Sequence, residues 1–579
     1  MTVWAGYYIR TQNTRVGGPL IKELRRAVSR NPHDTPTTIQ FEQSGFAYVE
    51  TGALSGASIC LEGEAFTLVA GEPLLRDTAG DRTADIGWLH DAWRNANFAA
   101  TTRALGTFAA VHFDETSGIL TLIADRLGLR PVYFAITEDC IIFASALRIL
   151  ESMPSVDKTI DLRGAIETVA LGYPLADRTQ YRGIHTIRDA EVIRFRGQTI
   201  ERSHYWRLTR LPEHRNTIEA VAREAHDAFA RAIDRRVGSD TRGVAFLSGG
   251  LDSRCVVAEL LTRGLEVHTF NFANEGTQDA VLGDTFARLA HTIHTRTARP
   301  DPVHWSTEMA RRWAQSPHRV DRPVERPGIV WSGDGGSVGF GCVGVYPSVI
   351  GLLRAGKRSA AVQKYFAEHE ISLPLRAFKR SIAREIRDLL SQGVREALDE
   401  VRTESEPGRE LYFFRMLHDQ RRHMALHFED MDLHGLEFHL PFYDAEVIEV
   451  IASAPADYCP RHRLYHRALP YFPPVVQAVP WQTYPGHETC PVTLGDTGLS
   501  QWGEDQRELL RRRRQRTIVH EAARAIWSPT FPGPLLNRWY LLAGSVLHWL
   551  GRGDYSYVLE YADRLDGLWR VSHGRWSFE

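Results

Sequence analysis

Cysteine is scarce in this sequence and is never closely paired. Six cysteines occur among 579 residues, and no CxxC pair is present. This pattern argues against a structural zinc site and against a disulfide framework. We therefore expect buried free thiols in a cytoplasmic protein. The six positions are Cys60, Cys140, Cys255, Cys342, Cys459 and Cys490.

Long apolar runs and an excess of charge are missing as well. No apolar stretch approaches the ~20 residues that a membrane helix needs. Residues 1–8 show no charged segment leading into an apolar one, which argues against a signal peptide. The formal net charge is -2 at pH 7, so no basic field attracts nucleic acid. We expect a protein that binds neither membranes nor nucleic acid.

The N-terminal part has the strand pattern of an antiparallel sheet. Apolar strand candidates at 106–113 and 119–124 flank a turn, and a second hairpin spans 131–144. Short paired strands of this kind favour a sheet with one packed face. Residues 1–205 are therefore predicted to form an α+β antiparallel sandwich.

A different pattern begins near residue 206. An amphipathic helix is predicted over 216–237. A buried strand at 243–247, a glycine loop, a helix and a further strand follow. This order is that of a βαβ unit. We predict an α/β parallel-sheet domain over 206–490, mostly helical beyond 355, and a helical C-terminal extension over 491–579.

The functional prediction depends on the glycine loop, which reads Ser248-Gly249-Gly250-Leu251-Asp252-Ser253. Glycines let backbone N–H groups approach an anion closely, and the helix that follows turns its positive end toward a pyrophosphate. Asp252 has the chemistry to hold a Mg²⁺ that bridges phosphate oxygens. No Gly-Lys-Ser/Thr follows, so this is not a Walker loop. The alternative is a tight glycine turn without a ligand.

This loop resembles the pyrophosphatase-type loop of the asparagine synthetase family, and three other stretches agree with that family in the same order. Residues 124–134 resemble its N-terminal amidotransferase domain, 332–336 its second ATP-site loop, and 437–444 a late motif of its synthetase domain. The resemblance implies an Ntn-hydrolase-like sandwich followed by a PP-loop ATPase domain.

The resemblance also implies cofactors and site residues. Family members use the loop to grip the pyrophosphate that leaves when ATP adenylates a substrate, so ATP and Mg²⁺ are implied. The metal would be held by Asp252 and Asp334. The residues implied to bind ATP or pyrophosphate are Leu247, Ser248, Gly249, Gly250, Leu251, Asp252, Ser253, Phe270, Ser332 and Gly333.

The N-terminal domain departs from the family at its nucleophile. Glutamine-using members have a cysteine after the initiator methionine, where this chain has Thr2, and residues 30–34 replace their Arg-Gly-Pro-Asp stretch. An N-terminal threonine can be activated by its own amine, but a hydroxyl is a far weaker nucleophile than a thiol. We predict an inactive glutaminase-like domain. Nitrogen would then come from ammonia or from an amine on the substrate or on a second substrate.

The second loop departs from the family after its first acid. Asp334 takes the place of that acid and would act as a base or as a Mg²⁺ ligand. Ser337 and Val338 replace an acidic pair, which removes a metal ligand. The alternative interpretation is a glycine turn capped by an aspartate.

The late motif lacks the lysine with which the family stabilises its acyl-AMP, because residues 460–467 contain none. Arg463 or Arg461 could supply positive charge there, although arginine is not an equivalent point charge. His462 could do so only if protonated. A solvated basic helix end is the alternative.

Two groups of polar residues carry weaker indications. Asp279 and Asp284 follow the second predicted strand, and a helix cap and a surface carboxylate are the simpler interpretations. His423, His427 and His434 lack a zinc spacing, which indicates core or substrate-pocket residues.

Two segments near the C-terminal end are unusual in composition. Residues 480–487 combine prolines, aromatics and a glycine, which indicates a rigid pocket wall or a packed surface turn. Arg511–Arg514 lie in a predicted helix over 508–526. They would form a solvated face or meet an acidic leader peptide or carrier.

The sequence leaves three functions open. The first is an ATP-dependent ligase that forms an amide without glutamine, similar to lasso-peptide cyclases or β-lactam synthetase, and Thr2 favours it. The second is an ammonia-using, asparagine synthetase-like enzyme, favoured by Asp334. The third is a degenerate ATP-binding scaffold subunit, which the intact phosphate loop opposes. Expected partners are ATP and a substrate, in one version a peptide, with carboxylate and amine groups; a second copy of the chain, a precursor peptide and a protease are further candidates.

Overall fold

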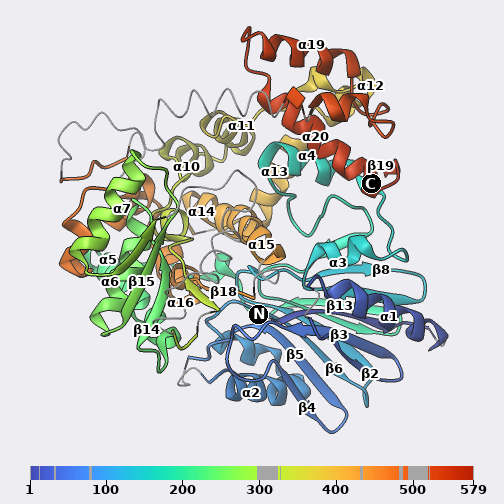
Figure 1. Cartoon of the computed structure of the whole chain (residues 1–579), viewed down its shortest axis with the longest axis horizontal. Coiled ribbons are helices and arrows are strands. Elements are labelled where there is room, and N and C mark those ends of the chain that lie inside the picture. The colour runs from blue at the N-terminus through green and yellow to red at the C-terminus, as the bar shows by residue number, and fades with distance from the viewer. Residues whose placement is uncertain are drawn as a thin grey trace.

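The structure is a computed structural model in which three regions can be followed in Figure 1: a strand-rich region at the lower right, a sheet flanked by helices at the left, and a helical region at the top right. The residues it describes are 2–11, 14–31, 34–76, 81–296, 324–326, 328–403, 405–430, 435–481, 487–492, 519–520 and 522–577.

The N-terminal region is a sandwich of two six-stranded sheets, and neighbouring strands in the two sheets run antiparallel. The first sheet has the order β11 (Ile184–Thr186), β8 (Tyr133–Ile136), β9 (Cys140–Ala144), β1 (Thr2–Ile9), β3 (Ser44–Glu50), β2 (Thr37–Gln40). The second has the order β13 (Thr199–His204), β12 (Glu191–Arg196), β7 (Ile119–Ala124), β6 (Phe108–Asp114), β5 (Ala65–Gly71), β4 (Ile59–Glu62). The predicted sandwich and both predicted hairpins are confirmed.

The side chains of β1 alternate between two layers of the sandwich. Trp4 and Tyr8 pack against the second sheet, in an aromatic core with Phe46 and Phe113. Val3 and the other residues of opposite parity contact the helices of the outer face. Successive side chains of a strand point to opposite faces, so one strand serves both layers. The covering helices are α1 (Gly17–Val28), α3 (Leu147–Ser152) and, on the second sheet, α2 (Arg82–Arg94).

The second region is built on a five-stranded parallel sheet, as the βαβ pattern predicted. Its order is β16 (Ile293–Arg296), β15 (Glu266–Asn271), β14 (Arg242–Phe246), β17 (Ile329–Trp331), β18 (Glu437–His439). After β14, the chain adds β15 and β16 on one side of that strand. It then returns and adds β17 and β18 on the other side. The sheet therefore has a topological switch point between β14 and β17.

Helices pack around this sheet and continue toward the C-terminus. Thr217 caps α5, because its hydroxyl accepts the N–H of Ala220. The helical character predicted beyond residue 355 is confirmed. The main helices are α5 (Ile218–Val237), α6 (Leu251–Thr262), α7 (Gln278–Leu289), α10 (Pro347–Arg354), α11 (Arg358–Glu368), α13 (Leu389–Glu400), α14 (Glu410–Phe414), a π-helical turn (Arg415–Gln420), α15 (Arg421–Asp430), α16 (Ala445–Ser453) and α17 (Arg463–Ala468).

The last helices return to the N-terminal half of the chain. Buried apolar residues of α12 (Arg380–Ile386), α19 (Arg538–Trp549) and α20 (Ser556–Val571) form one cluster with α4 (Leu162–Leu171). Beside it, β19 (Trp576–Ser577) pairs in parallel with β10 (Ile160–Asp161). Of the helix predicted over 508–526, residues 508–518 lie outside the described residues, and with them Arg511–Arg514.

Buried polar contacts join the sandwich to the parallel sheet. Arg130 and Glu437 form an ion pair of 2.6 Å, and each side chain is only 3% exposed. Next to it, a Glu72 carboxylate oxygen lies 3.4 Å from Nδ1 of His439. These contacts fix the N-terminal domain against the end of β18.

All six cysteines are free thiols, four of them buried. Within the described part of the chain, no helix combines the length and the hydropathy needed to cross a bilayer.

Candidate functional site

Three loops meet at the carboxyl edge of the parallel sheet. The glycine loop at residues 248–253, called the phosphate loop below, follows β14. The second loop, residues 332–336, follows β17, and residues 440–444 follow β18. The N–H of Leu247 donates to the carbonyl of Phe270, 2.7 Å away, and Ser332 N–H donates to the His439 carbonyl over 3.0 Å. Ligands of open α/β sheets bind at such a switch point, so the sequence motifs converge where the fold predicts a site.

The phosphate loop is held by its own side chains. The N–H of Ser248 donates to Ser253 Oγ over 2.9 Å, that of Gly249 to Asp279 Oδ1 over 2.6 Å, and that of Gly250 to Ser248 Oγ over 3.2 Å. These three N–H groups donate to side chains that hold the loop in its conformation. The first turn of α6, which starts at Leu251, has backbone N–H groups without partners inside the helix, and these are the donors that an anion would meet.

Arg254 locks the loop from behind. Its guanidinium is fully buried and donates to the carbonyls of Gly249 and Gly250, at 2.8 and 2.9 Å. It also donates to the carbonyls of Val479 and Pro480, at 2.7 and 3.1 Å. Burial lowers its pKa to about 10. Through these four hydrogen bonds, Arg254 ties the phosphate loop to the segment before residue 482. Residues 482–486 of the predicted rigid loop lie outside the described residues.

The second loop lies directly on the phosphate loop, which explains its glycines. A Cβ on Gly333 would lie 2.5 Å from the nitrogen of Ser253, and one on Gly336 would lie 2.3 Å from Cγ of Asp252. Gly335 has φ +92° and packs on the Tyr443 ring. Only glycine allows these approaches.

Asp252 is the point where the two loops and α17 meet. Ser337 Oγ donates to its Oδ2 over 2.6 Å, and the Tyr465 hydroxyl donates to its Oδ1 over 2.9 Å. Burial raises the pKa of Asp252 to about 6, against these two hydrogen bonds, and the charge of Asp334 adds to the rise. Ser337, which replaces a family acid, thus supports the remaining carboxylate.

Asp334 stands on the adjacent loop with its side chain half-buried. Its Oδ2 accepts the Ser332 hydroxyl over 2.8 Å. Among the described residues no group of three or more His, Cys, Asp or Glu is placed to hold a metal by itself. Mg²⁺, however, is commonly held by one or two carboxylates together with substrate phosphates, and Asp252 with Asp334 fits that donor set.

The positive charge expected from the late motif does not fit its surroundings. His462 is buried, and desolvation with the charges of His487 and His466 lowers its pKa to about 3. A neutral imidazole supplies no charge to a phosphate. Arg461 and Arg463 are both exposed. Arg461 and His462 adopt φ +61° and +62°, which is strained for side-chain-bearing residues.

One face of α15 is open beside Asp334. His423 is exposed, and Leu426 is 58% exposed although it belongs to a helix in the middle of the molecule (Figure 1). The His423 and His427 rings lie 5.1 Å apart. Desolvation and the charge of His427 lower the pKa of His423, whereas Asp334 raises it. These two histidines line an open face, and His434 lies outside the described residues.

Residue 2 is buried beside an arginine in the sandwich. Thr2 is 2% exposed, and its hydroxyl accepts Nη2 of Arg82 over 3.4 Å. The same guanidinium donates to the carbonyls of Val69, Gly71 and Gly56. In the replaced stretch at 30–34, the Asp34 carboxylate accepts the N–H groups of residues 30 and 31, and Pro32 and His33 lie outside the described residues.

The two further aspartates differ in role. Asp279 supports the phosphate loop, while Thr277 caps α7. Asp284 contacts His294 and Arg296 at 3.2 and 3.3 Å.

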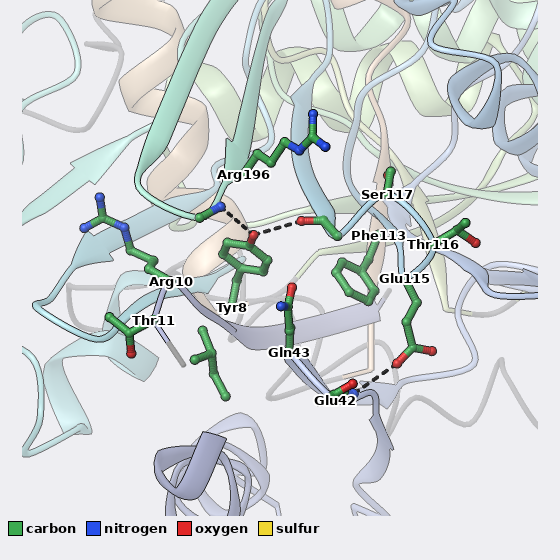
Figure 2. Close-up of a pocket in the computed structure, with 13 residues that line it drawn as sticks. Tyr8, Arg10, Thr11, Glu42, Gln43, Phe113, Glu115, Thr116, Ser117 and Arg196 are labelled. Atoms are coloured by element: carbon green, nitrogen blue, oxygen red, sulfur yellow. Dashed lines mark hydrogen bonds between the residues drawn. The ribbon is translucent and has the colours of Figure 1, made fainter. Parts of the chain in front are cut away.

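A separate cavity of about 460 Å³ lies at the other end of the sandwich, lined by neither loop. Figure 2 shows Tyr8 at its centre, with the hydroxyl accepting the N–H of Gly197 and donating to the Gly118 carbonyl, both over 2.8 Å. Arg10, Arg196, Glu42 and Glu115 are among the residues that line it. Its walls mix both charges, and none of the predicted site residues reaches it.

Sequence reasoning missed the residues that complete the site. Tyr465 lay inside the 460–467 stretch but had no assigned role, and Arg254 directly follows the phosphate loop. A polar residue next to a motif is the signal that could have found both. Their partners are 213 residues away for Tyr465 and up to 226 for Arg254, so no local pattern revealed the contacts.

Comparisons with known proteins agree with this architecture. A glutamine amidotransferase domain model matches residues 78–206, and an asparagine synthase model matches 224–466. A glutamine-hydrolyzing asparagine synthetase 3 of Bacillus subtilis is 28% identical over 179 residues, 31% of this chain and 29% of that protein. The asparagine synthetase 2 of the same organism, also glutamine-hydrolyzing, is 23% identical over 202 residues, 32% of this chain and 27% of that protein.

The matches therefore span less than a third of the length of these two relatives. Among solved structures, the allosteric regulatory enzyme of purine biosynthesis covers 48% of this chain and 66% of its own, at 9% identity and a TM-score of 0.24. Fold, loops and matched domains define a protein with an amidotransferase-type sandwich followed by a PP-loop synthetase domain. The chain belongs to the asparagine synthetase family.

Proposed function

We propose that this protein is an ATP-dependent, AMP-forming carbon–nitrogen ligase that does not use glutamine. The observation that carries the proposal is the meeting of Asp252 and Asp334 on adjacent loops at the switch point. An anion-binding helix start and two carboxylates suit a Mg²⁺-bound nucleotide.

The proposed reaction has two steps. The substrate carboxylate attacks the α-phosphorus of ATP, the bond to the β-phosphate oxygen breaks, and pyrophosphate leaves against the first turn of α6. The amine then attacks the acyl carbon of the acyl-AMP, loses a proton, and AMP departs. Mg²⁺ bound at Asp252 and Asp334 would neutralise the phosphate oxygens. Because lysine is absent from 460–467, a bound metal and the dipole of α6 would supply the charge that the family takes from a side chain.

The open face of α15 is the proposed place for the amine. His423 has its pKa lowered by desolvation and by His427, so it is neutral near pH 7 and can accept a proton. Asp334 is near enough to influence that imidazole, and Leu426 offers an apolar wall. These features support an acceptor site between α15 and the second loop.

The source of nitrogen is proposed to be an amine rather than glutamine. Thr2 replaces the cysteine of the glutamine-using pattern, and its buried hydroxyl contacts Arg82. Such a chain suits amide formation on a peptide or a specialised metabolite, including ring closure within one substrate. An ammonia-using asparagine-forming enzyme is the second candidate, supported by Asp334 and by the names of the two relatives.

Pyrophosphate release with ATP and Mg²⁺ tests the proposal. L-Aspartate with ammonium chloride probes the asparagine version, and peptides carrying a side-chain carboxylate and a free N-terminal amine probe the cyclase version. We expect Asp334→Asn to lower kcat/KM at least about 100-fold, and Asp284→Asn, the matched control, to leave it unchanged.

Two outcomes would contradict the proposal. Failure of the intact protein to bind ATP would rule out the ligase. Transfer of ¹⁵N from the glutamine amide into product, abolished by Thr2→Ala, would mean a working glutaminase.

A further inference from the structure

Helix α19 carries several large apolar side chains, both of its exposed tryptophans included, on the side that faces away from the core. Its buried face consists of Leu541, Gly544, Ser545 and His548. Two of these are small, and Ser545 and His548 are polar. A surface helix normally turns its apolar stripe toward the core, so the outer face of α19 needs an explanation.

The outer face is a continuous apolar stripe. Trp539, Val546 and Leu550 are 75%, 49% and 51% exposed, and Ala543 is exposed between them. Their spacings of four, three and four residues place them on one side of a helix. Trp549, 68% exposed, lies beside them. Figure 1 shows α19 at the outer edge of the molecule, with α20 beneath it.

The inner contacts of α19 are already complete. A Cβ on Gly544 would lie 3.1 Å from the Tyr555 ring, and the N–H of Tyr555 donates to His548 Nδ1 over 3.2 Å. Leu541 is fully buried in the cluster with α20. The helix therefore cannot roll to bury its tryptophans without losing these contacts.

Arginines are the charged residues that flank the stripe, whereas Asp554 contacts His548 on the buried face of α19. Residues 522–553 contain three arginines and no aspartate or glutamate. Arg538 begins α19 and Arg552 follows its last turn, and both are exposed. Paired across a twofold axis, two copies of this stripe would bring arginines together, which disfavours a dimer through it.

We propose that the outer face of α19 binds an amphipathic helical peptide with an apolar face about three turns long and carboxylates at both ends. Tryptophan and arginine are enriched where protein surfaces bind partners, and helix-on-helix docking uses anchors at i, i+3, i+4 and i+7 spacings. The site lies outside the phosphate loop and does not depend on the reaction proposed there.

The test uses the full-length protein and labelled model peptides in fluorescence anisotropy. One helical peptide carries leucines on one face and glutamates at both ends, and a second carries lysines in place of the glutamates. We expect the glutamate peptide to bind about tenfold more tightly at low salt, with the difference lost near about 0.5 M salt. Arg538→Glu/Arg552→Glu should invert the preference.

Variants of the stripe complete the test. Trp539→Gln/Val546→Gln should weaken binding of the glutamate peptide at least about tenfold. Leu289→Gln, at an apolar position on α7 that is as exposed as Val546, should not. Because these side chains are exposed, the variants should fold normally, and an unchanged Tm should confirm this. Equal binding of both peptides, or none at about 100 µM, overturns the proposal. So does stripe-dependent binding to phosphatidylglycerol vesicles, stripe-dependent dimers in sedimentation, or evidence that another segment of the chain already covers the stripe.

Discussion

At the scale of single residues, the site depends on what surrounds each charge. Asp252 is a carboxylate whose burial opposes its ionisation, while Ser337 and Tyr465 donate to it. His462, in the late motif, is held neutral by the same kind of burial. The two groups show how desolvation, rather than residue type, decides which charge is available.

Binding of Mg²⁺ and ATP should weaken as pH falls through about 6. The pKa of Asp252 is raised to about 6 in the folded protein, so below that value the folded carboxyl carries a proton that a metal must displace. Affinity should drop about tenfold for each further pH unit. Without metal, the protein should become less stable as pH rises from about 4, the pKa of an aspartate in the unfolded chain, toward 6. Over this range Asp252 holds its proton in the folded protein and loses it in the unfolded chain. Calorimetric titration with Mg²⁺ and ATP at a series of pH values measures the effect.

Tyr465→Phe provides the control for this pH dependence. It removes one donor to the ionised form, so the break should move to higher pH. A pH-independent affinity in the unmodified protein would contradict the prediction, and an unmoved break in the variant would contradict the role of Tyr465.

Arg254 should prove indispensable to the phosphate loop. Replacing it by lysine keeps a charge but loses the fork that reaches four carbonyls on two segments. We expect a loss of about 3 kcal/mol in stability, seen as a lower Tm, with weaker ATP binding. Arg395→Lys, at an exposed position of α13, should change neither. An unaltered Tm in Arg254→Lys would mean that the clamp is dispensable.

At the scale of elements, two glycine-rich loops follow neighbouring strands and touch. The phosphate loop was recognisable from its context between a strand and a helix, and the second loop from its resemblance to the family's second ATP-site loop. That the second loop lies on Asp252 was not recognisable, because the contact of Ser337 with Asp252 spans 85 residues. In the sequence, the glycines of the second loop are the signal that indicates this close contact.

Gly336→Ala should disturb the site without unfolding the protein. The new methyl group would lie 2.3 Å from Cγ of Asp252, which forces the loops apart. We expect about a tenfold loss of ATP affinity, measured by calorimetry. Gly351→Ala in α10 meets open space and should bind ATP normally with equal or higher stability. Normal ATP binding by the Gly336 variant would show that the loops can separate freely.

At the scale of the molecule, the sandwich is attached to the synthetase sheet through buried charge. Arg130 and Glu437 pair beside the strand that precedes the 440–444 loop. The C-terminal helices also return to α4 and β10 of the N-terminal half. The boundaries at 205 and 490 stay predictions, since residues on both sides of each pack together.

Glu437→Leu should be strongly destabilising because it leaves Arg130 buried without its partner. We expect about 3–5 kcal/mol, read from thermal unfolding. Arg130→Met/Glu437→Leu should recover most of the loss, since an apolar pair needs no compensation. Glu201→Leu, which breaks the exposed pair with Arg194, should cost less than about 1 kcal/mol. Equal losses in the single and double variants would mean that the pair's charge is not what matters.

The sequence by itself determined the two architectures, the positions of the hairpins and the βαβ unit, and the place of the glycine loop between a strand and a helix. Strand alternation, helix periodicity and glycine turns act over a few residues, so they can be read locally. The tertiary structure alone decided that Ser337 and Tyr465 meet at Asp252, that Arg254 clamps the loop, that His462 is neutral, and that α19 faces outward. These properties depend on burial and on contacts between residues far apart in the chain, and desolvation acts on whatever the fold places inside.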